Sequence, residues 1–196
     1  MKYKLFASAL TAAVLTLISG CETGNALLKD AQKGLDQIKP LVSAPNKVTE
    51  LLAWSAKEIE FVNAVQVHQK ANGLGHSVAD RKLQVRSAQN PSQRVQEINI
   101  VASLRMELPI DAIAARHASA GSTIAALAEY ISRRQAHEPT RMVIVANDPL
   151  SAAWMEQQAV TAFQKSNSKT TVNVEVSATA RPSIGWMSTG PIEKSV

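Results

Sequence analysis

A strand–helix–strand–helix–strand order between Glu97 and Ala180 is the feature that most restricts the fold of this chain. From Glu97 to Leu108, apolar and polar residues alternate, which is typical of a strand with one face on a core and the other in water. By its position in this alternation, Val101 is predicted to lie on the water-facing side. Residues 142–146 are almost continuously apolar, and such strands are usually covered on both faces. Residues 172–178 alternate again and predict a third strand.

Two helices are predicted between these strands. The first runs from Gly121 to Arg134, with Arg133 and Arg134 complementing its negative C-terminal end. Residues 112–120 are predicted as a loop or short turn. The second runs from Pro149 to Lys165. Its predicted inward residues are Ala152, Met155, Ala159, Val160 and Phe163. The predicted fold class is therefore α/β (α+β), a small mixed sheet covered by helices.

An N-terminal helical segment precedes the sheet and covers residues 47–72. Its apolar stripe is predicted to include Leu52 and Ile59, with Trp54, Phe61 and Val65 widening it, while Glu58 and Glu60 are interpreted as surface charges. The pattern leaves open whether this helix joins the core or stands off as a stalk. Residues 72–93 are predicted to be mostly loop, with a short edge strand at 83–85.

The N-terminus carries the only cysteine of the chain, Cys21. Lys2 and Lys4 precede an apolar run from Leu5 to Ile18, and Ser19 and Gly20 follow it. This run is shorter than the roughly twenty residues that a helix needs to cross a bilayer, and it fits a cleavable signal. An ordinary secretory signal or a signal anchor with an incidental cysteine is the alternative.

These residues resemble a bacterial lipoprotein signal with its lipobox. The resemblance implies cleavage between Gly20 and Cys21, diacylglycerol on the thiol, and an N-acyl chain such as palmitate on the new N-terminus. Glu22 stands where inner-membrane retention uses aspartate, so the resemblance implies a lipid anchor in the outer membrane, facing the periplasm. No other cofactor is expected.

Composition sets limits on the mature chain. The sequence has 21 lysines and arginines against 16 acidic residues, and removal of Lys2 and Lys4 reduces the excess from five to three. This charge is too small to indicate nucleic-acid binding. With Cys21 acylated, no disulfide or thiolate metal site remains.

The predicted organisation has five parts. A signal peptide (1–20), an acylated tether (21–46), the helical segment (47–72), an α/β periplasmic domain (73–180) and a tail (181–196) follow one another. The tether is interpreted as a solvated amphipathic spacer, and a helix that packs on a partner is the alternative. The tail is predicted to be loose, with one short strand near Ile184.

The layout from residue 97 resembles the OmpA-like periplasmic domain, the family that includes peptidoglycan-associated lipoproteins. The run from Leu104 to Pro109 is similar to its first strand, residues 123–134 to its first helix, and residues 142–148 to its second strand and binding loop. Leu150-Ser151 and Ala159-Val160 are similar to the helix that follows.

This resemblance implies a role for Asp148 in contacting peptidoglycan. In the family, an aspartate of this loop and an arginine of the next helix bind the diaminopimelate of the cell wall. Asp148 matches the aspartate, but the helix 149–165 contains no arginine, and Trp154 or Met155 stands in its place. A helix N-cap is the other role predicted for Asp148.

Motifs for catalysis are absent from the sequence. There is no G-x-S-x-G, H-E-x-x-H or P-loop pattern, and the four histidines are scattered. His117, Ser119 and Ser122 are close in sequence but lack a strand-to-helix elbow. We therefore expect neither an enzyme nor a metal site.

The sequence thus predicts an outer-membrane lipoprotein that is a structural or assembly component of a cell-envelope machine, such as a secretion, conjugation or pilus apparatus. Its expected partners are the outer membrane, through the lipid, and envelope proteins or further copies of itself. The alternative is an OmpA-like cell-wall tether that binds peptidoglycan.

Overall fold

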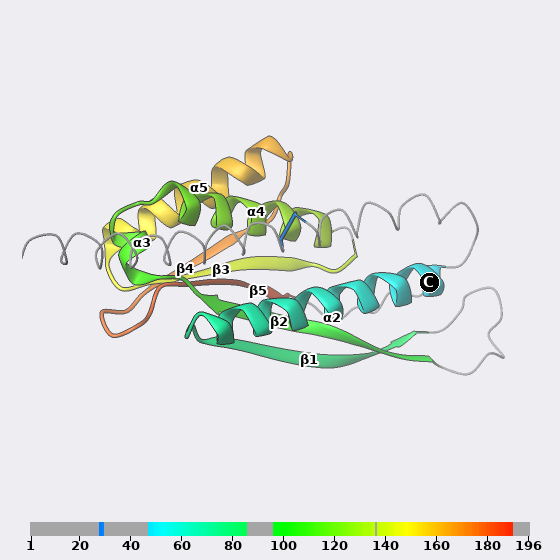
Figure 1. Cartoon of the computed structure of the whole chain (residues 1–196). Coiled ribbons are helices and arrows are strands. Elements are labelled where there is room, and N and C mark those ends of the chain that lie inside the picture. The colour runs from blue at the N-terminus through cyan, green and yellow to red at the C-terminus, as the bar shows by residue number, and fades with distance from the viewer. Residues whose placement is uncertain (1–27, 30–46, 86–95, 136, 190–196) are drawn as a thin grey trace, which may run out of the picture.

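The computed structural model describes residues 28–29, 47–85, 96–135 and 137–189. The elements in chain order are α2 (Lys47–Ala71), β1 (His76–Val85), β2 (Gln96–Glu107), α3 (Ile110–Ala114), α4 (Ala118–Arg134), β3 (Thr140–Ala146), α5 (Pro149–Lys165), β4 (Val172–Val176) and β5 (Ser183–Ser188). The predicted class, a mixed sheet covered by helices, is confirmed (Figure 1).

The five strands form one sheet in the order β1-β2-β5-β3-β4. Antiparallel pairing joins β1 to β2, β2 to β5 and β5 to β3, whereas β3 and β4 are parallel. Parallel neighbours need a long crossover, and α5 supplies it. The strand–helix–strand–helix–strand order predicted from Glu97 is present as β2, α4, β3, α5 and β4.

The helices lie over the sheet in two groups. Helices α4 and α5 pack on each other and on β3 and β4, while α2 runs along β2 (Figure 1). The strands beneath them contribute one continuous core that includes Leu104, Met142, Ile144, Ile184 and Trp186. Burial of each such side chain contributes roughly 1.5–3 kcal/mol to folding.

Helix α2 is part of this core and not a stalk. It buries Trp54, Phe61 and Val65, whereas Leu52 and Ile59 are exposed on its outer side. The prediction that Leu52 and Ile59 lie on the core face is wrong. The aromatic side chains determine which side turns inward, because they bury the most apolar surface.

Strand β1 is longer than the sequence indicated. We predicted a short strand at 83–85, but β1 begins at His76 and pairs with β2 along its whole length. Its polar residues include Asp80, Arg81 and Lys82, and charges of this kind are typical of an edge strand.

A β-bulge in this hairpin changes which residues of β2 turn inward. Ala79 pairs with Ser103, but the next residue, Asp80, pairs with Val101. Because a bulge locally breaks the alternation of a strand, the neighbours Ile100 and Val101 are both buried. The prediction that Val101 faces water is therefore wrong.

Strand β5 lies in the middle of the sheet, between β2 and β3. The short strand predicted near Ile184 is present, but residues 183–188 are an integral strand and not part of a loose tail. A glycine is required in it, since a Cβ at Gly185 would lie 1.8 Å from the carbonyl oxygen of Leu104.

Helices α4 and α5 fit the predictions in part. Asp148 is the N-cap of α5, Pro149 its first residue and Lys165 its last, all as predicted. Val160 is exposed, contrary to prediction. Residues 112–120 are not a plain loop, because α3 occupies their start and α4 begins at Ala118.

Candidate functional site

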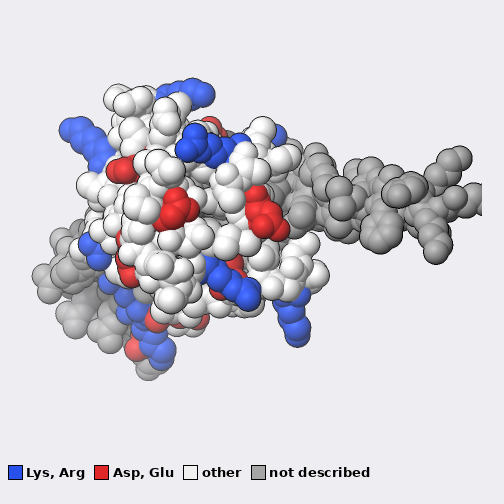
Figure 2. All heavy atoms as spheres, turned by 90° about the vertical axis from the view of Figure 1, so that its left-hand side faces the viewer, with Lys and Arg blue, Asp and Glu red and all other residues white. Residues whose placement is uncertain are grey.

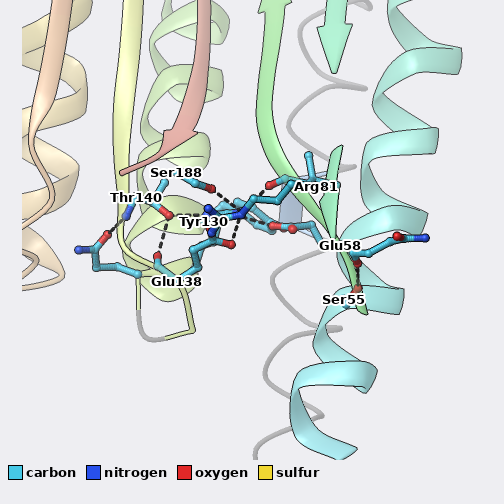
Figure 3. A network of polar contacts seen from close by, with 11 residues as sticks. Ser55, Glu58, Arg81, Tyr130, Glu138, Thr140 and Ser188 are labelled. Carbon is cyan, nitrogen blue, oxygen red and sulfur yellow. Dashed lines mark hydrogen bonds and ion pairs between the residues drawn. The ribbon is translucent and has the colours of Figure 1, made fainter. Parts of the chain in front are cut away.

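Charged residues gather at two places in the described part of the chain. The first is an interior network between α2, the sheet and α4, and Figure 3 shows Glu58, Tyr130 and Glu138 as members of it. Arg134 bonds to most of its members. The second is the corner where α3 meets the start of α5, around Asp148.

Arg134 connects α2 to α4. Its Nε donates to Oε1 of Glu58 at 2.7 Å, and the hydroxyl of Tyr130 donates to the same oxygen at 3.3 Å. Its Nη2 donates to the carbonyl oxygen of Val101 at 2.6 Å. The guanidinium of Arg134 therefore hydrogen-bonds to Glu58 of α2 and to the backbone of Val101 in β2.

The network continues toward β1 and β3. Nη2 of Arg134 also contacts Oε2 of Glu138 at 3.2 Å, and Arg81 of β1 forms an ion pair with the same carboxylate. Nη1 of Arg134 donates to the hydroxyl of Thr140, which in turn donates to the backbone oxygen of Glu138 at 2.7 Å. Two cations thus balance the carboxylates of Glu58 and Glu138.

Aromatic rings enclose the guanidinium. The Cζ atom of Arg134 lies 5.5 Å from the ring centroid of Trp54 and 5.4 Å from that of Trp186. Tyr130 packs beside Trp186 with a centroid distance of 5.3 Å. These rings exclude water and add cation–π attraction, which strengthens when the cation is desolvated.

Burial shifts the pKa values of this network. It raises the pKa of Glu58 above the ordinary value of about 4.5, and the Arg134 guanidinium opposes that shift. Burial also raises the pKa of Tyr130 well above 10, and the neighbouring Glu58 carboxylate adds to the effect. Shifted pKa values often mark catalytic groups, but they also occur in structural ion pairs.

The burial of the Arg134 network favours a structural role over a catalytic one. The side chains of Glu58, Arg134 and Glu138 are each 0% exposed, and their bonds reach helix, strand and loop atoms of the same fold. A substrate could not touch these three side chains without a rearrangement of the fold. The network therefore holds α2 to the sheet, and removing one partner would leave a buried charge uncompensated.

Sequence reasoning missed this network. Glu58 was interpreted as a surface charge, and this is wrong because its side chain is buried against Arg134. Arg134 is a basic residue of the last turn of α4, as predicted, but its buried ion pair with Glu58 was not foreseen. One signal was present in the sequence: Trp54, Glu58 and Phe61 are spaced i, i+4 and i+7, which places them on one face of a helix.

Asp148 lies at the surface corner as the cap of α5. Its Oδ1 accepts hydrogen bonds from the backbone amides of Leu150 and Ser151, each at 2.9 Å. Hydrogen bonding from Ser151 chiefly lowers the pKa of this carboxyl below its ordinary value of about 3.8. The predicted N-cap role is confirmed, and it leaves Asp148 ionised at neutral pH.

Arg116 is the residue that sequence reasoning missed at this corner. Its positive charge also lowers the pKa of Asp148, although less than the hydrogen bonds do. Arg116 precedes α4 and has a φ of 51°, in the left-handed region that disfavours most side chains. The fold thus brings a cation near Asp148 from outside α5, which itself carries none of the arginines of the chain.

His117 and Ser119 meet at the start of α4. Nδ1 of His117 lies 2.8 Å from Oγ of Ser119 and accepts from the backbone amide of the same residue at 3.4 Å. His117 is exposed and Ser119 is half-buried, and the two residues are only two positions apart. The pair is thus an N-cap of α4, since its bonds satisfy groups of the first turn.

The charge distribution gives no single-sign surface at this end of the molecule. Figure 2 shows lysines and arginines interspersed with acidic residues and separated by neutral surface. Binding of nucleic acid by its phosphates relies on a basic patch or stripe. The visible face does not present one.

The remaining predicted sites lie outside the described residues or do not assemble. Gly20 and Cys21 belong to the first group. Within the described ranges, no three histidine, cysteine or acidic side chains gather as metal ligands. In the same ranges, none of the helices has the length and apolar character needed to cross a bilayer.

No protein-family model, curated protein or solved structure matches this chain. The function is therefore argued from the residues and their geometry.

Proposed function

We propose that the chain is an outer-membrane lipoprotein whose domain is a structural or assembly component of a cell-envelope machine, such as a secretion, conjugation or pilus apparatus. Lipid on Cys21 anchors the domain, which faces the periplasm. The sequence from Lys2 to Cys21 supports the anchor, and the outer surface of α2 supports the assembly role.

The outer face of α2 is the observation that carries the assembly role. Leu52, Ile59 and Val67 are 42%, 37% and 71% exposed, and their spacing places them along one side of the helix. Exposed apolar side chains along one side of a helix offer apolar surface that another protein can cover. Because the Arg134 network fixes the opposite side of α2, this patch has a defined orientation.

The sheet edges add a second mode of contact. The strand order ends in β1 and β4, so no described strand pairs with their outer edges. Free backbone groups of an edge strand accept a strand from another chain. Val176, on β4, is 48% exposed and would contribute apolar contact there.

In-cell crosslinking tests this proposal. A photoreactive amino acid at Leu52 or Val67 is expected to give discrete adducts with envelope proteins or with a second copy, whereas one at Lys165, at the end of α5, is not. Adducts that are equally weak at all three positions would contradict an assembly role for the outer face of α2.

The anchor is tested separately. The full chain is expected to incorporate a palmitate analogue and to fractionate with the outer membrane, and Cys21→Ala is expected to abolish both. Incorporation that persists in Cys21→Ala, or a soluble wild-type protein, would contradict lipidation at this residue.

The alternative function is a peptidoglycan tether of the OmpA-like kind, and Arg116 favours it. A zwitterionic wall component needs a cation near the carboxylate of Asp148, and Arg116 is close enough to lower the pKa of that carboxyl. Sedimentation with purified peptidoglycan tests this alternative. Binding that is lost in both Asp148→Ala and Arg116→Ala would support it, and absence of wild-type binding would exclude it.

A further inference from the structure

The first described residues, Leu28 and Lys29, follow closely after Cys21 in the sequence. Leu28 is only 1% exposed and belongs to the same core cluster as Trp54 and Ile100, whereas Lys29 is exposed. Figure 1 shows this stretch in blue beside the body of the domain. A leucine of a solvated spacer would not be buried in the core of the domain that follows it.

The sequence around Leu28 fits this burial. Apolar residues recur at helical spacing between Ala26 and Ile38, with charges such as Lys33 and Asp36 between them. Burial of Leu28 beside an exposed Lys29 is what an amphipathic segment shows when its apolar side meets a core.

We propose that the tether is docked: Leu28 anchors it in the hydrophobic core, so that only the residues between Cys21 and Leu28 separate the domain from its lipid. This inference rests on the proposed lipid anchor and adds the geometry of that anchor. A chain spans at most about 3.5 Å per residue, so the attachment point at Leu28 lies within about 25 Å of the lipidated residue.

Docking changes which partners the domain can reach. If the chain were free from Cys21 to the start of α2 at Lys47, the same estimate would allow about 90 Å. A docked domain instead stays beside the outer membrane, which favours partners embedded in that membrane or lying on it. Release of Leu28 would extend the reach more than threefold.

Energy transfer from the domain to the bilayer measures this geometry. The full lipidated chain is placed in vesicles whose headgroups carry an acceptor dye. Cys21 is the only native cysteine and its thiol is acylated, so Val176→Cys on β4 offers one exposed thiol for the donor dye. The transfer efficiency falls as the domain moves away from the surface.

Two insertions of the same fifteen-residue Gly-Ser segment provide the comparison. Placed after Glu22, the insertion lies between the lipid and Leu28, and the mean height is expected to rise by about 10 Å with a clear loss of transfer. Placed after Ala44, it lies behind the docking point, and the transfer is expected to stay unchanged. Equal losses for both insertions would overturn the docked tether.

A third variant tests Leu28 itself. In Leu28→Asp, the insertion after Ala44 is expected to lower the transfer as much as the one after Glu22 does, whereas Lys29→Asp keeps the difference between them. An unchanged difference in Leu28→Asp would overturn the role of Leu28. A chain that does not associate with vesicles at all would overturn the lipid anchor, whereas an anchored chain with equal insertion effects overturns docking alone.

Discussion

Helices α2 and α5 both lie on the sheet, but different forces hold them. The inner face of α5 consists of apolar residues such as Ala152, Met155, Ala159 and Phe163, and its charged contact, Asp148, lies at the surface. Such packing is stabilised by burial and has little directional preference.

Helix α2 adds buried polar contacts to its apolar ones. The hydroxyl of Ser55 donates to the backbone oxygen of Asn99, and Nε2 of Gln69 donates to that of Glu107 at 2.8 Å. Glu58 lies between them with its ion pair to Arg134. Hydrogen bonds are directional, so these three contacts fix both the position of α2 along β2 and its rotation.

This difference shows how α2 can pack its inner side on the core while keeping an apolar outer side in solvent. The apolar outer side of α2 would compete for burial if the helix turned around its axis. The buried aromatic residues and the directional contacts of the inner side together prevent this. Helix α5 needs less of such control, because its exposed apolar residues, Leu150 and Val160, are fewer. We therefore expect the packing of α2 on the sheet to depend on its buried ion pair, and the packing of α5 to depend on the fit of its apolar side chains.

The largest effect is expected for Arg134→Met. The carboxylates of Glu58 and Glu138 would remain buried without this guanidinium, and the free energy of unfolding should fall by about 3–5 kcal/mol. Urea unfolding measures it, with Arg133→Met as the control at the neighbouring position. A loss below about 1 kcal/mol would show that charge does not hold α2.

A slightly smaller effect is expected for Met155→Ala on α5. Truncation leaves a cavity under the helix and should cost about 2–4 kcal/mol. The loss in free energy of unfolding should be the same at pH 5 and pH 8, because no ionisable group is involved. The cost of Arg134→Met should be smaller at pH 5, where Glu58 can take up a proton. A pH-dependent cost at Met155 would weaken the contrast.

The two carboxylates should respond to pH with opposite signs. The pKa of Glu58 is raised in the fold, so the folded state holds its proton longer and stability falls as pH rises above about 4.5. The pKa of Asp148 is lowered, so its contribution is present above about 3.8 and is lost as pH falls through the folded value.

Unfolding measured from pH 3 to pH 8 checks these signs. The stability difference between wild type and Glu58→Gln should shrink with rising pH, whereas that between wild type and Asp148→Asn should grow and then level off. If both stability differences changed in the same direction with pH, the environments described for Glu58 and Asp148 would be contradicted.

The smallest effect is expected on the outer face of α2. Val67→Ser should change the free energy of unfolding by no more than about 0.5 kcal/mol, because the side chain is largely exposed in wild type. The same variant should still weaken the crosslinks expected at this face. A loss comparable to that of Met155→Ala would place Val67 in the core and remove it from the proposed contact surface.

The elements predicted best are those that local pattern specifies. The strands β2 and β3 and the Asp148-Pro149 start of α5 were predicted from neighbouring residues alone, and all three are present. Only the alternation of β2 fails at Val101, where the bulge breaks it. The N-cap of α5 was predictable because an aspartate before proline satisfies the free amides of a first turn.

The features that sequence reasoning missed depend on distant partners. Glu58 and Arg134 are far apart in the chain, and a charge on a helix ordinarily indicates a solvent-exposed face. The place of β5 between β2 and β3 likewise depends on pairings across the sheet, and only Gly185 marks the close approach. Arg116 comes near Asp148 because α3 and α5 meet, which no spacing in the sequence indicates.

The measurement that tests the account most directly is a double-mutant cycle of Glu58→Gln and Arg134→Met. The proposed assembly surface requires α2 to be fixed with its outer face in solvent, and this ion pair is the contact held to fix it. The account predicts a coupling energy of about 2 kcal/mol or more in urea unfolding. Additive single effects, with coupling near zero, would show that this ion pair does not hold α2 and would contradict the account.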